Sequence, residues 1–594
     1  MRNGLRINAI GGLLLTLLLT GATGWATAPD APVADAARDG DVAALRVLIA
    51  RGEDVNAPQG DGMTALHWAA EHGDVEITNL LIYAGANLEA GTRIGRYVPL
   101  HIASQAGSAP VVEALLEAGA DVDAATTTTG VQAIHLGAQS GSAEVVRLIV
   151  RNGADVNARE DSWGHTPLTF AASQNRTEAI RALLELGADP SIHSRSVDID
   201  RRQEVDGAAN KRLEEVLQQF RVQEADETED WSPSPEQVQA AVRAARRVQS
   251  VGPVEREDGE ADAPRGDVGG WGGLNPLLHA VRAGHVEATF ALLDGGADID
   301  AVSAGDGTSP LLIAALNGHF DLAVALLERG ADPNVASEAG ATALYAAINL
   351  EWAPKSRYAQ PRSHEFQGTT YLGLMEALLQ AGADPDAKLS KDIWYKWSGR
   401  SALAATAFWR ASYGTDVDAM RLLVRYGADP AIATAKGPDR RPPQQDTVAA
   451  DAEVEAELDP SGLLPVPEGG PSTYPIHAAS GVGYGENYSE GNVHRHAPNG
   501  WLPAIAFLVE ELRVDVNARD ENGYTAVHHA AARGDVALIR YLVDHGADVT
   551  LLSRKGQSTA DMANSPGQRL PVHPEALALL ESLGSINHHD CYVC

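Results

Sequence analysis

Apolar residues recur along this chain in pairs of short runs at helical spacing, separated by glycines and polar turns. The pattern is clearest over 61–87, where the first run follows Thr64, a residue suited to accepting a hydrogen bond at a helix start. Gly73 can end this run in the left-handed conformation. The second run places Val75, Ile77, Leu80 and Leu81 on one face. The sequence therefore predicts two short helices followed by a turn.

The helix pair is repeated, and each copy ends in an almost constant phrase that reads GADVNA at its most regular. The first five copies of the phrase lie 33, 34, 34 and 34 residues apart. The phrase begins at Gly52, Gly85, Gly119, Gly153, Gly187, Gly296, Gly330, Gly382, Gly427 and Gly546. A period in this range is typical of a solenoid of stacked units, in which the recurring aspartates are structural turn residues.

The helix starts share a capping residue and, often, a proline in the next position. The predicted caps equivalent to Thr64 are Thr166, Asn275, Ser309, Thr342, Ser401 and Thr525. The prolines are Pro99, Pro167, Pro276, Pro310 and Pro475. Proline suits the first helical turn because the N–H that it lacks would be unpaired there.

These units resemble the ankyrin repeat, whose signature T-P-L-H-x-A is nearly reproduced as VPLHIA at Val98, HTPLTFAA at His165 and YPIHAA at Tyr474. The resemblance covers the chain from about Val33 to Gly584. With its export signal, the chain is similar to exported, bacterial-type ankyrin repeat proteins. It implies an all-α ankyrin-repeat solenoid of helix-turn-helix units with β-turn fingers, in two blocks with a helical or disordered insertion.

Five histidines occupy the signature position, one in each of five repeats: His67, His101, His135, His477 and His528. Read alone they could suggest metal ligands. The resemblance implies instead that they bond to the backbone between adjacent turns.

The repeat pattern also predicts the domain boundaries. We expect a signal peptide over 1–28, repeats over 33–195, a charged insertion with a short helix over 196–270, repeats over 271–434, a Pro/Glu-rich linker over 435–471, repeats with a C-terminal cap over 472–586, and a His/Cys tail over 587–594.

The insertion contains one predicted helix, which starts with a capping box formed by Ser234, Pro235 and Gln237. Its apolar stripe consists of Val238, Ala241, Val242, Ala245 and Val248. We interpret the insertion as a hinge or a decorative insertion that divides the repeats into two blocks. The alternative is a partner-binding helix.

The N-terminus has the pattern of an export signal: Arg2 and Arg6, an apolar stretch over 10–19, and small residues up to Ala26. The stretch is short for a membrane span, which needs about 20 residues. We expect a mature, exported protein without a membrane span, located in the periplasm or outside the cell. An N-terminal membrane anchor is the alternative.

The charge balance bears on the partner. The chain has 80 acidic and 46 basic residues, for a formal charge of −34, which would repel phosphate backbones and argues against nucleic acid. The acidic charge suggests a basic or amphiphilic protein partner.

Both cysteines lie in the terminal sequence NHHDCYVC. Cys591 and Cys594 could form a disulfide or remain idle, or they could bind a metal together with His588 and His589. Covalent haem attachment needs C-x-x-C-H, and we do not expect it because this sequence shows no histidine after Cys594.

We therefore predict a monomeric, non-enzymatic scaffold without a cofactor that binds a protein outside the cytoplasm. The alternative is a metal- or thiol-dependent redox accessory protein that uses the tail. The resemblance implies contacts at turn tips and on the exposed face of the first helices: Trp68, Tyr97, Gln105, Gln139, Trp163 and Phe170. Aromatic-rich breaks in the pattern add Trp352, Trp394, Trp397 and Trp409, although such rings could instead cover the edge of the local core.

Overall fold

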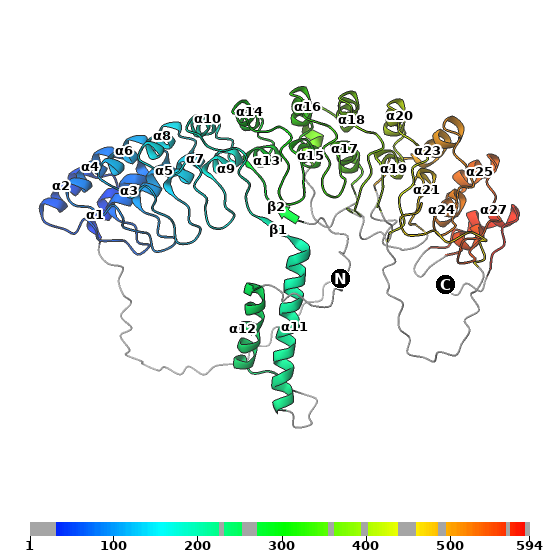
Figure 1. Ribbon diagram of the computed structural model, residues 1–594, viewed down its shortest axis with the longest axis horizontal. Coiled ribbons are helices and arrows are strands. Elements are labelled where there is room, and N and C mark those ends of the chain that lie inside the picture. Colours follow the sequence, from blue (N-terminus) through cyan, green and yellow to red (C-terminus); the bar gives the residue numbers. More distant parts are fainter. Residues whose placement is uncertain are drawn as a thin grey trace, which may run out of the picture. The chain divides into compact units, whose positions relative to one another are not determined.

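The computed structural model describes residues 31–224, 231–251, 270–353, 362–391, 393, 402–437, 459–484, 495–565 and 571–588. The chain divides into two compact units. One comprises Met1–Gly137 with Leu148–Ala154, and the other comprises Ala138–Arg147 with Asp155–Cys594. Both are built from pairs of short helices joined by long finger-like turns (Figure 1).

The first unit contains three complete helix pairs. They are α1 (Pro32–Arg38) with α2 (Val42–Ala50), α3 (Ala65–His72) with α4 (Val75–Tyr83), and α5 (Pro99–Ala106) with α6 (Ala109–Glu117). The first helices pack on one another, α1 on α3 and α3 on α5, while α4 packs on α6. The unit boundary passes through the next pair, α7 (Ala133–Ser140) and α8 (Ala143–Arg151).

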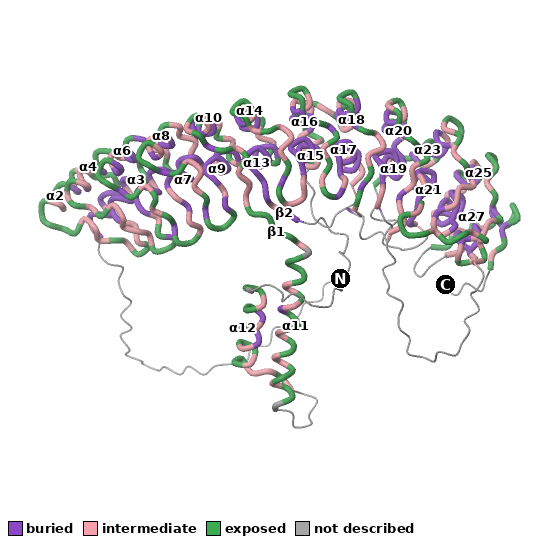
Figure 2. The backbone as a smooth tube through the Cα atoms, viewed as in Figure 1, coloured by how far each residue is buried: buried purple, intermediate pink, exposed green. Residues whose placement is uncertain are grey.

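The second unit continues the same plan. Its elements are α9 (Pro167–Ser173), α10 (Thr177–Glu185), α13 (Pro276–Arg282), α14 (Val286–Asp294), α15 (Pro310–Leu316), α16 (Phe320–Glu328), α17 (Ala343–Glu351), η1 (Ser363–Phe366), α18 (Tyr371–Gln380), α19 (Ala407–Tyr413), α20 (Val417–Arg425), α21 (Pro475–Ser480), α23 (Trp501–Ala506), η2 (Phe507–Glu511), α24 (Ala526–Ala532), α25 (Val536–Asp544), α26 (Thr559–Ala563) and α27 (Pro574–Ser582). The buried residues lie between the two rows of helices (Figure 2). No helix in the described ranges is both long and apolar enough to cross a membrane.

Helix caps follow the prediction at several repeats. The side chains of Thr166, Asn275, Ser309 and Thr342 each accept a backbone N–H at the start of the following helix. One predicted cap is wrong: α19 begins after Thr406, which accepts the N–H of Trp409, whereas Ser401 lies outside the described residues. The run of small residues after Ser401 resembles the start of the first helix of a repeat, which led to the wrong cap.

The recurrent phrase forms a hydrogen-bonded ladder between neighbouring repeats. Its last polar residue accepts the backbone N–H of the aspartate or asparagine in the next phrase. Asn56 accepts from Asn87 (2.6 Å), Asn157 from Asp189 (2.9 Å), and Asn517 from Asp548 (2.8 Å). Asp300, Asn334 and Asp386 make the same bond. The aspartates of the phrase are structural as well, because their side chains accept the backbone N–H two residues later, as Asp155 does from Asn157 (2.9 Å) and Asp298 from Asp300 (3.0 Å).

The insertion is more helical than the sequence predicts. The expected helix is α12 (Pro235–Val251), and its capping box is present, with Ser234 N–H donating to Gln237 Oε1 at 2.8 Å. A longer helix, α11 (Ile199–Glu224), was missed. The two helices, here called the arm, pack together and bury Ala209, Ala241 and Ala245.

The arm branches from a finger. Strands β1 (Ser196–Asp198) and β2 (Gly270–Gly272) pair antiparallel at its base, with Val197 opposite Trp271. The helices before and after the arm pack directly, α9 on α13 and α10 on α14. Asn175 links them, since its Oδ1 accepts the N–H of Ala288 at 3.1 Å. The arm therefore interrupts the sequence pattern, whereas the helix stack continues across it.

Candidate functional site

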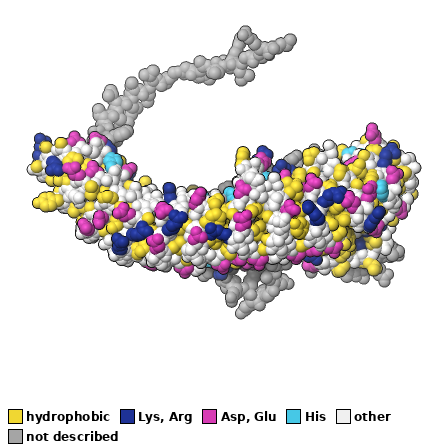
Figure 3. Space-filling view, turned by 90° about the horizontal axis from the view of Figure 1, so that it is seen from above, with side chains coloured by type: hydrophobic (Ala, Val, Ile, Leu, Met, Phe, Trp, Pro, Cys, Tyr) yellow, Lys and Arg dark blue, Asp and Glu magenta, His cyan; other side chains and the backbone are white. Residues whose placement is uncertain are grey.

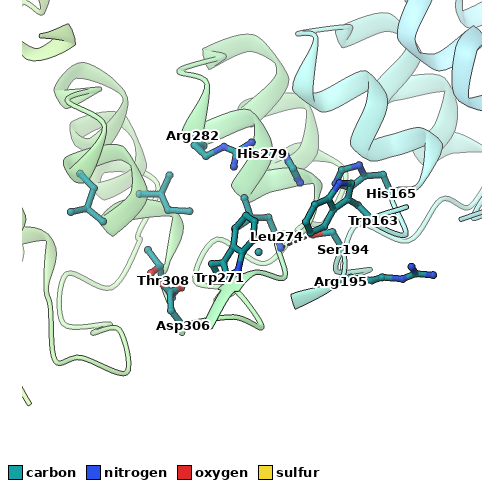
Figure 4. Close-up of a pocket in the computed structure, with 13 residues that line it drawn as sticks. Trp163, His165, Ser194, Arg195, Trp271, Leu274, His279, Arg282, Asp306 and Thr308 are labelled. Carbon is teal, nitrogen blue, oxygen red and sulfur yellow. Dashed lines mark hydrogen bonds between the residues drawn. The ribbon is translucent and has the colours of Figure 1, made fainter. Parts of the chain in front are cut away.

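A pocket of about 430 Å³ lies in the second unit at the base of the arm (Figure 4). It is formed where the fingers meet the first helices α13 and α15. The residues that line it are Trp163, His165, Ser194, Arg195, Trp271, Gly272, Leu274, His279, Arg282, Asp306, Thr308, Ile313 and Leu316. Only Trp163 among them is a residue that the sequence analysis proposed as a contact.

Trp271 is held in place by closely approaching glycine backbones. A Cβ atom on Gly305 would lie 2.8 Å from the carbonyl oxygen of Gly272 and 2.9 Å from the carbonyl carbon of Trp271. A Cβ on Gly270 would lie 2.3 Å from the oxygen of Gly305. Only glycine therefore permits this contact between β2 and the next finger. The contact fixes the backbone from which the Trp271 side chain projects.

Trp163 is positioned by a buried carboxylate in its own finger. Glu160 accepts the backbone N–H groups of Ser162 (2.6 Å), Trp163 (2.7 Å) and His165 (3.0 Å). Burial opposes ionisation, but these three donors lower the pKa of Glu160 below its ordinary value. The finger is also tied to the base of the arm, because Arg195 N–H donates to Trp163 O at 2.7 Å.

The two indoles form an exposed aromatic wall. Their ring centroids are 5.7 Å apart with an interplanar angle of 65°, an edge-to-face arrangement. Trp163 is 41% exposed and Trp271 is 49% exposed. Trp residues that expose this much area on rigid backbones are strong candidates for interface hot spots.

Behind this wall lie two histidines in edge-to-face contact, His165 and His279, with ring centroids 5.1 Å apart. Burial, His165 and Arg282 together lower the pKa of His279 to about 3. Burial also lowers the pKa of His165, against the opposing charge of Glu160. Both rings are therefore neutral at neutral pH. His279 Nε2 is buried and has no hydrogen-bond partner within the described part of the chain.

The charged groups at the pocket differ in their pairing. Asp306 accepts the hydroxyl of Ser303 and the N–H of Thr308 within its own finger. Arg195 donates to Ser162 O at 3.2 Å. Arg282 is exposed and forms no side-chain hydrogen bond or ion pair with any described residue. Among the described residues, the pocket thus combines an apolar aromatic wall with one unpaired cation.

The contacts predicted in the first unit are accessible to different degrees. Gln105 on α5 is exposed. Trp68 on α3 is half-buried, and its Nε1–H donates to Gln59 Oε1 at 3.0 Å. Tyr97 is also half-buried and packs edge-to-face against His101.

The two contact residues predicted on first helices of the second unit, Phe170 and Gln139, differ in their surroundings. Phe170 is half-buried and lies edge-to-face with His165, which brings it next to the pocket. Gln139 is half-buried, and its carbonyl accepts Arg176 Nε–H at 2.9 Å. The structure therefore places Phe170 against His165, which lines the pocket together with Trp163.

Among the residues of the aromatic-rich breaks, the prediction that Trp409 contacts a partner is wrong. Its side chain is only 3% exposed, stacks on Tyr413 and donates to Thr473 O at 3.0 Å, so it belongs to the core. Trp352 is half-buried, and its Nε1–H donates to Asp416 at 2.8 Å. Trp394 and Trp397 lie outside the described residues.

The signature histidines bond the backbone of their own helix start, and His67 and His477 also bond the next repeat through Nε2, as the resemblance implied. In the described part of the chain, Nε2 of His101 and of His528 makes no such bond. His67 Nδ1 accepts the N–H of Thr64 at 3.1 Å, and its Nε2 bonds Tyr97 O at 2.9 Å. His101, His135, His477 and His528 accept the N–H three residues earlier in the same way.

The C-terminal tail is described only up to His588, so His589, Cys591 and Cys594 lie outside the described residues. His588 bonds Asp561, with its N–H to Oδ1 at 2.7 Å and its Nδ1 3.0 Å from Oδ2. Within the described ranges, no three His, Cys, Asp or Glu side chains form a group that could hold a metal ion.

The pocket residues that sequence analysis missed do carry a positional signal. Trp68 and Phe170 lie four residues after their helix cap, whereas Gln105 and Gln139 lie at the seventh position. Counted from Asn275, these positions are His279 and Arg282; counted from Ser309, they are Ile313 and Leu316. Trp271 had no such signal, because it lies in the glycine-rich stretch next to the predicted insertion.

Comparisons with known proteins agree with this architecture. A family described as "Ankyrin repeats (3 copies)" matches residues 33–126, 100–194 and 277–352. A second family, "Ankyrin repeats (many copies)", matches residues 493–543.

Three curated relatives match over short stretches. "Ankyrin repeat family A protein 2" of Homo sapiens is 36% identical over 76 residues, or 13% of this chain and 24% of that protein. "Palmitoyltransferase akr1" of Schizosaccharomyces pombe is 37% identical over 62 residues, or 10% of each chain. "BCL-6 corepressor" of Homo sapiens is 39% identical over 64 residues, or 11% and 4%. The chain thus spans less than a quarter of each relative. Residues 33–194, 277–352 and 493–543 are ankyrin repeats, and the chain folds as an all-α ankyrin-repeat solenoid.

Proposed function

We propose that this chain is a non-enzymatic, monomeric ankyrin-repeat scaffold that binds a protein partner outside the cytoplasm. The observation that carries the proposal is the pocket at the base of the arm, where Trp163 and Trp271 expose large apolar surfaces on constrained backbones. Repeat scaffolds present extended surfaces, and binding energy on such surfaces concentrates in a few aromatic and arginine residues.

The recurrent polar side chains of the repeats are engaged in hydrogen bonds that hold the fold, which supports a binding role for the chain. The recurrent Asp and Asn residues serve the ladder between repeats, and the signature histidines serve the helix starts. These groups are therefore assigned to the fold, which leaves the exposed side chains of fingers and first helices for recognition. Gln105 and the half-buried Trp68 and Tyr97 of the first unit are proposed as additional contacts.

The surface charge fits a partner that combines polar and apolar contacts. On the face shown in Figure 3, acidic, basic and apolar side chains are interspersed. Basic groups pair with acidic groups across neighbouring repeats, as Arg329 does with Asp294 and Arg421 with Glu511. The export pattern over 1–28 supports the proposed location.

The test is photo-crosslinking with mass spectrometry in the native compartment. It compares the natural chain with Trp271→Ala and Trp163→Ala. Truncation of a hot-spot residue costs about 2 kcal/mol or more, so we expect capture of the partner to fall by at least about tenfold. Tyr83→Ala on α4 is the matched control, since Tyr83 is 93% exposed but lies outside the pocket.

Undiminished capture in both tryptophan variants, with unchanged circular dichroism, would show that the pocket is not the contact. The location is tested separately by immunodetection in cytoplasmic and extracytoplasmic fractions. Detection only in the cytoplasmic fraction would contradict that part of the proposal.

A further inference from the structure

Two polar side chains on α13 face the pocket without a partner among the described residues. His279 and Arg282 are three residues apart and therefore lie on the same face of the helix. His279 is only 8% exposed, and its buried Nε2 forms no hydrogen bond. Such an atom is costly to leave unsatisfied and indicates that a ligand or water supplies the missing bond.

Arg282 differs from the paired arginines in this chain. Arg46 pairs with Glu76, Arg147 with Glu185, and Arg329 with Asp294, in each case across neighbouring repeats. The acidic group on the finger beside Arg282 is Asp306, which is already bonded to Ser303 and Thr308. Since no described residue pairs with the Arg282 side chain, this cation in a chain of charge −34 can accept an external anion.

The rest of the lining is apolar. Ile313 and Leu316 on α15 line the pocket. Trp271 lies between the α13 side chains and the fingers (Figure 4). The volume of about 430 Å³ suits a few residues of an extended chain. A ligand that fills the pocket must therefore present an apolar side chain to Trp271 and Ile313 and an anionic group to Arg282.

We propose that the pocket binds an extended peptide segment in which a carboxylate pairs with Arg282 and a neighbouring aliphatic or aromatic side chain packs on Trp271. The carboxylate also provides an acceptor within the pocket for the His279 imidazole. The carboxylate belongs to an Asp or Glu side chain or to a chain terminus, two sources of the same chemistry. This inference rests on the proposed protein-binding function and specifies the partner of that same site.

The test uses a random peptide library displayed with free C-termini and selected on the full-length chain. We expect the enriched sequences to carry an acidic residue or a terminal carboxylate next to an aliphatic or aromatic residue. Arg282→Gln should weaken their binding by about tenfold, as expected when a charge-assisted hydrogen bond is lost. Arg540→Gln on α25 is the control, since Arg540 is exposed and lies outside the pocket.

Synthetic versions of the best sequence distinguish the two sources of the carboxylate. One version replaces Glu by Gln, and the other carries a C-terminal amide. The version that removes the pairing carboxylate should bind about tenfold more weakly to the natural chain and show no further loss with Arg282→Gln.

The possible failures are distinguishable. If Trp271→Ala abolishes binding but Arg282→Gln does not, peptide docking stands and the carboxylate inference is overturned. If neither variant changes binding, the pocket is not the contact and both proposals are overturned. Selection of sequences without a carboxylate near an apolar residue, or of no pocket-dependent sequence, also overturns the inference.

Discussion

The imidazole of His67 accepts the backbone N–H of Thr64 at Nδ1, and four other signature histidines make the same bond. A ring nitrogen accepts a hydrogen bond only when it carries no proton, so each of these rings is needed in its neutral form. Burial lowers the pKa of His67 and of His101 below the ordinary value of 6.5. Burial, the neighbouring His529 and Arg519 lower the pKa of His528 to about 3.

These shifts predict the pH dependence of stability. Well above pH 6.5, His67, His101 and His528 are neutral in both the folded and the unfolded chain, so their contribution is complete. Below pH 6.5 the unfolded chain binds protons that the folded chain does not, and the free energy of unfolding falls. His528 alone should remove about 2 kcal/mol between pH 6.5 and pH 5, at about 1.4 kcal/mol per pH unit.

Urea unfolding measured between pH 8 and pH 5 checks this prediction. His528→Gln is the comparison, because glutamine can accept the Thr525 N–H but does not titrate. The variant should be less stable at pH 8 and should show a shallower loss between pH 6.5 and pH 5. Equal slopes for the two proteins would contradict the assignment.

At the scale of single elements, β2 depends on the glycine at position 305 because of close backbone approach. The backbone of Gly305 does not adopt a positive φ, so alanine would be compatible with its conformation. The Cβ of alanine would nevertheless meet backbone atoms of Trp271 and Gly272 at 2.8–2.9 Å.

Gly305→Ala should therefore displace β2 and cost about 1–3 kcal/mol, a typical penalty for overpacking. Hydrogen exchange should accelerate at Gly273 and Leu274, whose N–H groups donate to Arg195 O and Ser194 Oγ. Gly207→Ala on α11 is the opposite control: nothing lies near its Cβ position, and helix propensity predicts a gain of about 0.5–1 kcal/mol. Unchanged exchange over 270–274 would contradict the proposed restraint.

Sequence patterns predicted most repeat helices, because their caps, prolines and apolar spacing all point to the same structure. The pattern failed where only one of these signals was present. Near Ser401 a run of small residues imitated a first helix, but the helix begins after Thr406. Helix α11 was missed because it lies outside the repeat pattern, although Val205, Ala209, Leu213 and Val216 recur in it at helical spacing.

The candidate site was harder to predict than the fold. Trp163 could be proposed from its position at a turn tip. Its neighbour Trp271 follows the arm in the sequence. The pairing of β1 with β2 brings the chain back to the finger that carries Trp163. Such a juxtaposition depends on tertiary structure and leaves no local periodic signal.

At the scale of the second unit, the arm should be dispensable for folding. Asp198 and Gly270 are paired residues at its base, so a two-residue Asn-Gly turn can join them as a hairpin. The contacts of α9 with α13 and of α10 with α14 do not involve the arm.

Replacement of residues 199–269 by Asn-Gly should therefore leave the thermal midpoint of the remaining repeats roughly unchanged, within the few degrees that correspond to about 1 kcal/mol. Circular dichroism should show the loss of helix expected from α11 and α12 alone. Loss of exchange protection in α9 and α13 would instead show that the arm supports the stack.

The ladder between repeats also bears on how the protein ages chemically. At Asn334 and Asn517 the side-chain amide bonds the next repeat twice: Oδ1 accepts an aspartate N–H, and Nδ2 donates to the carbonyl of Gly382 or Gly546, at 2.9 Å in both cases. Deamidation to aspartate would keep the acceptor, as Asp300 and Asp386 already demonstrate at equivalent positions. It would remove the donor and place a carboxylate beside a carbonyl oxygen. Spontaneous damage at these asparagines would therefore loosen one junction at a time and leave the others intact.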